Sequence, residues 1–156
     1  MSEPRAWVAS ISRSSGGVPK LGVPSARVTA SGVEGDAQRD RRHHGGPDRA
    51  VCLYSLERIN ALRAEGHPIG PGTAGENVTI AGLDWDRVTP GTRLVLGAVE
   101  LEITAFAAPC ETIVGSFRDK RSTRISQKLH PGWSRVYARV LAEGELAAGD
   151  TVAIRP

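Results

Sequence analysis

The stretch "RLVLGAVELEI", residues 93–103, largely decides how the chain folds, because its alternating residues favour a single strand pairing. A two-residue Gly-X loop, here Gly97-Ala98, is typical of the type II′ turn that joins antiparallel strands. The resulting register puts Arg93 opposite Glu102, a pair of opposite charges, on the polar face. A shift of one residue would turn the apolar face outward. The sequence therefore predicts a hairpin whose core-facing residues are Leu94, Leu96, Val99, Leu101 and Ile103.

Similar short strands are predicted on both sides of this hairpin. The 156 residues include 18 glycines and 10 prolines, scattered singly and in pairs, which indicates many tight turns. Many short strands in one unit predict a mainly β fold, a small closed or nearly closed β-barrel with a few short helices. The length predicts a single domain over residues 2–156. The further predicted strands cover residues 7–11, 26–30, 50–55, 78–80, 136–142 and 151–155.

Two helices are predicted between the strands. In the first, Ser55 is a suitable N-cap and Gly66 suits the position that ends a helix. The second is predicted over residues 121–129, with Ile125 and Leu129 on its inner face.

Composition places the chain among ordinary globular proteins. Hydrophobic residues make up 40% and charged residues 24% of the chain. No run of 18 apolar residues predicts a transmembrane helix, and the N-terminus lacks the pattern of a secretory signal. Two cysteines make a poor disulfide framework, so we expect a reducing, cytoplasmic location.

The net charge is too weak to argue for a nucleic-acid partner, but the positive charge is unevenly spread. The net charge is only +3, and two Phe and two Tyr residues leave few platforms for stacking bases. Positive residues nevertheless cluster in two places, within residues 39–49 and within residues 118–128. These clusters are either solvated faces or the two sides of a site for a small anionic ligand.

Cys110 is the residue with the clearest chemical potential. The chain contains no Cys-x-x-Cys or His-Glu-x-x-His metal motif, no phosphate-binding P-loop and no Gly-x-Ser-x-Gly elbow. Pro109 has no amide donor, so it favours the end of a strand and places Cys110 at the barrel rim. Cys52, inside the predicted strand 50–55, is expected to be a small core residue. Four roles are open for a thiol at the rim: an inert residue, a nucleophile, a sulfur carrier or a soft metal ligand.

An ordered set of motifs over nearly the whole chain resembles the MOSC family, named for the C-terminal domain of molybdenum cofactor sulfurases. The resemblance is strongest to small stand-alone bacterial members. The matching motifs are "GGVPK" (16–20), "GVEGD" (32–36), "HHGGPDRAV" (43–51), "GTAGENVTIAGLDW" (72–85), "PGTRLVLG" (90–97), "PC" (109–110), "YARVLAEG" (137–144) and "GDTVAI" (149–154).

This resemblance implies a β-barrel that binds the molybdenum cofactor, with Cys110 as the molybdenum ligand. The cofactor is a pterin that carries a dithiolene and an anionic phosphate, so it needs a soft thiolate and hydrogen-bond donors. The residues in family motifs that could contact it are Lys20, His44, Arg49, Glu76 and Asn77. Each of these residues also has a purely structural interpretation. Lys20 could be a solvated lysine, His44 could stabilise a turn, and Glu76-Asn77 could bond only to loop backbone.

Three functions are compatible with these residues. The first is a molybdenum-dependent reductase of N-hydroxylated compounds, such as N-hydroxylated purine bases, with a flavoprotein as electron donor. The second is a non-catalytic carrier of sulfur or cofactor on Cys110. The third is a structural or nucleic-acid-binding barrel. Larger members of the family have a second domain that helps to enclose the cofactor, so the pocket here is expected to be either shallow or completed by a second subunit in a homodimer.

Overall fold

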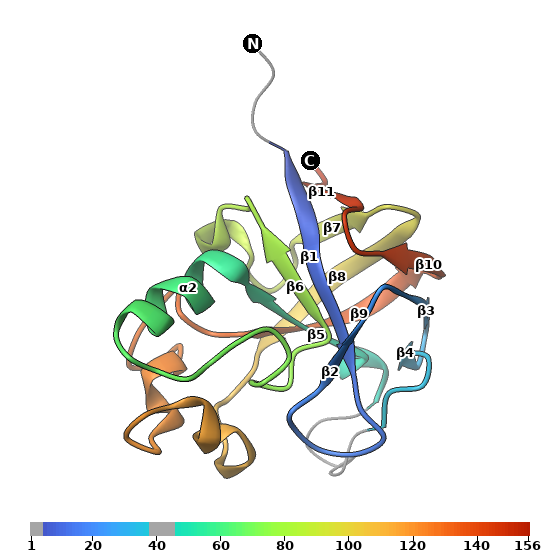
Figure 1. The fold of residues 1–156 in the computed structure, drawn as a ribbon. Coiled ribbons are helices and arrows are strands. Elements are labelled where there is room, and N and C mark those ends of the chain that lie inside the picture. The colour runs from blue at the N-terminus through green and yellow to red at the C-terminus, as the bar shows by residue number, and fades with distance from the viewer. Residues whose placement is uncertain (1–4, 38–45) are drawn as a thin grey trace.

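Seven strands form a closed barrel in the computed structural model, which describes residues 5–37 and 46–156 (Figure 1). Around the barrel the order is β11, β7, β8, β9, β5, β6 and β1, and β1 pairs again with β11. Only β5 and β6 are parallel among these neighbours. Closure leaves the barrel without exposed edges, as the predicted fold requires. The strands are β1 (Ala6–Arg13), β5 (Val51–Ser55), β6 (Val78–Ala81), β7 (Arg93–Leu96), β8 (Val99–Phe106), β9 (Val136–Ala142) and β11 (Thr151–Ile154).

The remaining elements lie around this barrel. Strand β2 (Leu21–Val23) extends the sheet from β1, and a separate small sheet contains β10 (Gly144–Ala147), β3 (Ser25–Thr29) and β4 (Gly32–Val33). Helix α2 (Leu56–Ala64) packs on the outside against β5 and β6. In Figure 1 the orange segment below α2 follows β8. The 3₁₀ helices are η1 (Pro47–Arg49), η2 (Trp85–Arg87), η3 (Glu111–Ser116) and η4 (Ser122–Ile125).

The hairpin of β7 and β8 has the predicted register. Arg93 lies opposite Glu102, and Leu96 lies opposite Val99. The five predicted core residues are each at most 1% exposed. Gly97 has φ +56°, a left-handed conformation that only glycine adopts without strain, which is what a type II′ turn needs at its first central position.

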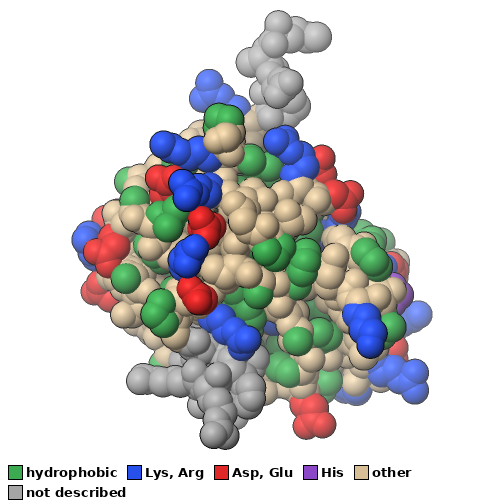
Figure 2. Space-filling view, turned by 180° about the vertical axis from the view of Figure 1, so that it is seen from behind, with side chains coloured by type: hydrophobic (Ala, Val, Ile, Leu, Met, Phe, Trp, Pro, Cys, Tyr) green, Lys and Arg blue, Asp and Glu red, His purple; other side chains and the backbone are tan. Residues whose placement is uncertain are grey.

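The outer face of this hairpin is a row of ion pairs. Arg93 Nε lies 3.3 Å from Glu102 Oε1, and Glu102 also pairs with Arg139 of β9. Arg155 Nε lies 3.4 Å from Glu100 Oε1. Figure 2 shows positive and negative side chains alternating across the back of the molecule. Such exposed pairs contribute little stability individually, so the buried face is what sets the register.

The first predicted helix is present, and both of its predicted end residues are confirmed. The hydroxyl of Ser55 accepts a hydrogen bond from Arg58 N at 3.2 Å, and Gly66 has φ +98° just after the helix. Ile59 and Leu62 are fully buried against the barrel. These residues bury the side of α2 that faces the sheet.

The second predicted helix, 121–129, is wrong in its length. Only Ser122–Ile125 is helical, and it is a 3₁₀ turn. Ile125 is buried as predicted, whereas Leu129 is 59% exposed. Ser126 adopts an extended conformation, and its hydroxyl accepts from Leu129 N, so a side chain replaces the helical backbone bond.

Candidate functional site

The end of β8 delivers Cys110 to the rim of the barrel. After Phe106 the backbone hydrogen-bond ladder between β8 and β9 continues for one bond, from Ala107 N to Arg135 O at 2.9 Å. The ladder then ends before Pro109. Cys110 is the residue that precedes η3, and it is partly exposed. Its Sγ lies 2.7 Å from Thr112 Oγ1. The predicted rim position is therefore what the structure shows.

Cys52 has the opposite environment. It lies inside β5, is 4% exposed and packs with Ala107 and Tyr137 in a small apolar cluster. Burial raises the pKa of the Cys52 thiol to about 11, so this thiol stays protonated at neutral pH. The chain therefore contains one enclosed, unreactive cysteine and one accessible cysteine.

The 3₁₀ helix η1 is fixed against β8 and β9. Thr104 Oγ1 donates to the backbone carbonyl of Asp48, and the Asp48 carboxylate lies 3.6 Å from Arg139 Nη1. These contacts hold η1 so that the Arg49 guanidinium lies over the ring of Tyr137, 5.3 Å from its centroid. This is the geometry of a cation–π interaction.

Tyr137 is a buried phenol under this guanidinium. Burial raises the pKa of Tyr137 to about 12, while the positive charges of Arg135 and Arg49 lower it. His44 lies outside the described residues, and the roles of His44 and Arg49 as cofactor contacts stay predictions.

Lys20 and Asn77 meet in a buried polar network. Lys20 Nζ lies 2.6 Å from Asp36 Oδ2, and both side chains are only 6% exposed. Asn77 Nδ2 also donates to Asp36 Oδ2, at 2.9 Å, while Asn77 Oδ1 accepts from Cys52 N. Asn77 thus ties β5 to the turn that follows β4. These bonds indicate that Lys20 and Asn77 support the site from within.

Glu76 is a fully buried carboxyl group. Its Oε2 accepts from Thr79 Oγ1 at 3.3 Å, but its Oε1 has no hydrogen-bond partner within residues 5–37 and 46–156. Burial raises the pKa of Glu76 from 4.5 to about 7, against the opposing effects of backbone hydrogen bonds and the Arg135 charge. Glu76 is therefore partly protonated near neutral pH.

Glu76→Gln should remove a pH dependence of stability. The pKa of Glu76 is higher in the folded chain than in the unfolded chain, so its contribution is fully present below pH 4.5 and is lost as the pH rises through 7. We expect the variant to match the parent near pH 4.5 and to exceed it at pH 8 by about 1–3 kcal/mol. Urea unfolding at both pH values measures this. Equal pH profiles for the two proteins would contradict it.

Arg135 is the residue that sequence patterns missed. It is 3% exposed, and its Nη1 donates to Ala74 O at 2.9 Å while its Nη2 donates to Ala108 O at 3.1 Å. It therefore joins the glycine-rich loop that precedes β6 to the loop that carries Cys110. The sequence offered one indication of its position: side chains alternate along a strand, so Arg135 and Tyr137 point to the same face.

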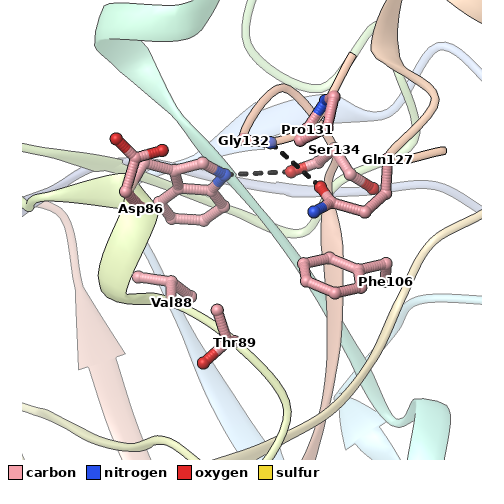
Figure 3. A pocket seen from close by; sticks show the side chains of 9 residues that line it. Asp86, Val88, Thr89, Phe106, Gln127, Pro131, Gly132 and Ser134 are labelled. Carbon is pink, nitrogen blue, oxygen red and sulfur yellow. Dashed lines mark hydrogen bonds between the residues drawn. The ribbon is translucent and has the colours of Figure 1, made fainter. Parts of the chain in front are cut away.

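A pocket of about 240 Å³ adjoins the segment before Cys110 (Figure 3). Trp85 and Phe106 line it, and Figure 3 shows the side-chain amide of Gln127 near the ring of Phe106. Trp85 Nε1 donates to Ser134 O at 2.9 Å, and Ser134 Oγ donates to Ala107 O. The pocket wall is thus bonded to the backbone that leads to the cysteine.

The MOSC domain family model matches residues 40–153, a range that includes Arg49, Cys110 and Arg135. The chain belongs to the MOSC domain family. Membership supports binding of the molybdenum cofactor. No helix in the described parts of this MOSC chain is long and apolar enough to cross a membrane.

Three curated relatives cover most of the chain. The uncharacterized protein YflK of Bacillus subtilis (strain 168) is 33% identical over 117 residues, which are 74% of this chain and 52% of YflK. Protein YiiM of Escherichia coli (strain K12) is 28% identical over 126 residues, 78% of this chain and 55% of YiiM. The chain thus spans about half the length of these two relatives. A protein named Reductase from Gibberella moniliformis (strain M3125 / FGSC 7600) is 30% identical over 132 residues, 81% of this chain and 23% of the reductase.

Solved structures have the same fold. The YuaD protein from Bacillus subtilis matches with a TM-score of 0.77 at 16% identity, over 96% of this chain and 94% of YuaD. YiiM from Geobacillus stearothermophilus matches with a TM-score of 0.71 at 23% identity, over 97% of this chain and 75% of YiiM. These likenesses confirm the predicted MOSC-like barrel.

Proposed function

We propose that this chain holds the molybdenum cofactor through Cys110 and reduces N-hydroxylated compounds. The observation that supports this most directly is the contrast between the two cysteines. Cys52 is enclosed among apolar groups, whereas Cys110 is brought out of the barrel at the end of β8. A thiol that served only packing would not need this position, and a partly exposed thiol is available as a soft metal ligand.

The surrounding residues fit this cofactor. Its dithiolene would supply sulfur ligands of its own, so a single thiolate from Cys110 would be the ligand that the protein contributes. Its phosphate needs cationic donors, and the Arg49 guanidinium, which lies over the ring of Tyr137, is the donor that we assign to it. Lys20, Glu76 and Asn77 are enclosed. We assign them to the wall of the site, and their direct contact with the cofactor stays a prediction.

The reduction converts R–NH–OH, two electrons and two protons into R–NH₂ and water. The bound cofactor would supply the two-electron chemistry, with electrons from a flavoprotein. Cys110 would anchor the cofactor at the rim, and Arg49 would orient an anionic group of the cofactor. Tyr137, whose pKa is raised to about 12, keeps the proton on its Oη throughout the neutral range. The name of the Gibberella relative, Reductase, is in keeping with this reaction class.

Protein produced in a host that makes the cofactor tests the proposal. We expect close to one molybdenum per chain by elemental analysis. We also expect conversion of N-hydroxylated adenine to adenine when a reduced viologen dye replaces the flavoprotein as electron source. Chromatography of the purine products measures turnover.

Two outcomes would contradict parts of the proposal. Protein without molybdenum after production in that host would remove the cofactor assignment. Protein with molybdenum but without turnover of any N-hydroxylated compound would leave the carrier function, in which Cys110 holds cofactor or sulfur without catalysis.

A further inference from the structure

Arg135 bonds to the loop just before Cys110. Ala108, whose carbonyl accepts from Arg135 Nη2, is two residues before the cysteine. The other end of the guanidinium donates to the carbonyl of Ala74 in the glycine-rich loop. One planar group with fixed donor directions thus sets the spacing between the two loops.

A second bond joins the same two loops on the far side of Cys110. Ser116, the last residue of η3, donates from its Oγ to Thr73 Oγ1 at 2.9 Å. Thr73 Oγ1 in turn donates to Gly70 O, also at 2.9 Å, so its position is fixed within its own loop. Cys110 therefore lies between two attachments to the loop 70–76, one at residue 108 and one at residue 116.

A buried arginine at position 135 is a poor choice if the side chain serves only to stabilise the fold. Its Nε is enclosed and has no hydrogen-bond partner in the described ranges 5–37 and 46–156. A buried cation with an unpaired donor is commonly less stabilising than an apolar side chain of the same size. The geometric role, a fixed bridge between two carbonyls, is what a methionine or leucine could not reproduce.

We propose that Arg135 is a positioning residue that holds Cys110 at the rim in the place where it meets the metal. This rests on the proposed function, in which Cys110 is the ligand. Arg135 acts through the Ala108 and Ala74 carbonyls and has no direct part in the chemistry. The Ser116–Thr73 bond is the second support of the same loop.

The reactivity of Cys110 in cofactor-free protein tests the position directly. The alkylation rate by iodoacetamide is measured for each cysteine over a full pH range, with modified peptides separated by mass. The plateau of the alkylation rate at high pH reports how accessible Sγ is. The pH at which the rate is half of this plateau reports the electrostatic environment of the thiol. In Arg135→Met we expect the Cys110 plateau rate to rise at least fivefold, because the loop loses its bridge, while Cys52 stays protected.

Arg58→Met is the matched control. Arg58 Nε donates to Gly132 O at 2.9 Å, and its guanidinium lies over Trp133, so it supports the segment just before Arg135 without touching the cysteine loop. We expect its Cys110 plateau rate to stay within twofold of the parent. Arg135→Lys, which can reach only one of the two carbonyls at a time, should lie between the parent and Arg135→Met.

A merely structural Arg135 would give a different result. Its loss would then leave the Cys110 rate within twofold of the parent in folded protein, or raise the Cys52 and Cys110 rates together in folded protein, and either result overturns the proposal. Should Arg135→Met not fold, Ser116→Ala provides the second variant, with an expected rise of at least twofold for Cys110 alone; no change would again overturn it. Because these rates need no cofactor, their failure is distinguishable from a failure of molybdenum binding.

Discussion

Cys110→Ser is expected to abolish molybdenum binding and reductase activity while leaving thermal unfolding almost unchanged. The Cys110 thiol is partly exposed and its described contact is with the Thr112 hydroxyl, so replacing sulfur by oxygen removes little packing. A serine hydroxyl is a harder and far less acidic ligand than a thiol, and it does not ionise near neutral pH. Elemental analysis and the melting temperature of the same preparation measure the two effects together.

Cys52→Ser is the matched control within the same chain. Cys52 is 4% exposed and packs between Ala107 and Tyr137, so a hydroxyl there would be buried in an apolar cluster. We expect a loss of on the order of 1–3 kcal/mol in the free energy of unfolding, with molybdenum retained by the folded fraction.

Two results would revise the role of Cys110. Full molybdenum and full activity in Cys110→Ser would make it an inert rim cysteine. Molybdenum retained without activity would make it a nucleophile or sulfur carrier, with the cofactor held by other residues.

Lys20→Met is expected to destabilise the fold by about 3–5 kcal/mol, because it breaks a buried ion pair from one side. The Lys20–Asp36 pair is almost completely enclosed, with 2.6 Å between Nζ and Oδ2. Without the ammonium group, the Asp36 carboxylate would keep the hydrogen bonds from Asn77 Nδ2 and Ser14 N but lose its counter-charge. Urea unfolding of cofactor-free protein measures the change.

Lys128→Met serves as the control for this substitution, since Lys128 is exposed and the same change there should cost less than about 0.5 kcal/mol. The comparison also separates two roles of Lys20. A lysine that served only to bind the cofactor phosphate would leave the cofactor-free protein with unchanged stability, and that result would contradict the structural role inferred from the ion pair.

The hairpin and the capped helix were predictable because their information is local. Alternation around Gly97 specifies which face is buried, and a one-residue slip reverses it, so residues 93–103 determine their own register. The cap at Ser55 and the stop at Gly66 depend only on neighbouring backbone groups. The helix predicted over 121–129 failed because two apolar residues four apart are weak evidence, and Ser126 provided a competing side-chain bond.

The candidate site likewise has features that local sequence predicts and features that it does not. Pro109-Cys110 at the end of an apolar run was enough to predict a rim cysteine, because proline ends a ladder wherever it lies. Lys20 was predicted as a cofactor contact from its motif, and its partner Asp36 is sixteen residues away in another turn. No spacing rule shows that the closed barrel brings these two charges into one enclosed place.

By itself, the sequence determined the barrel class, the hairpin register, the first helix with its caps and the contrast between the two cysteines. These follow from alternation, turn residues and the backbone chemistry of proline. Only the tertiary structure decided that Lys20 pairs with Asp36, that Asn77 bonds to the backbone of Cys52, and that Arg135 bridges Ala74 and Ala108. The physical reason is that a buried polar group must find a partner, and that partner depends on how segments distant in the sequence meet.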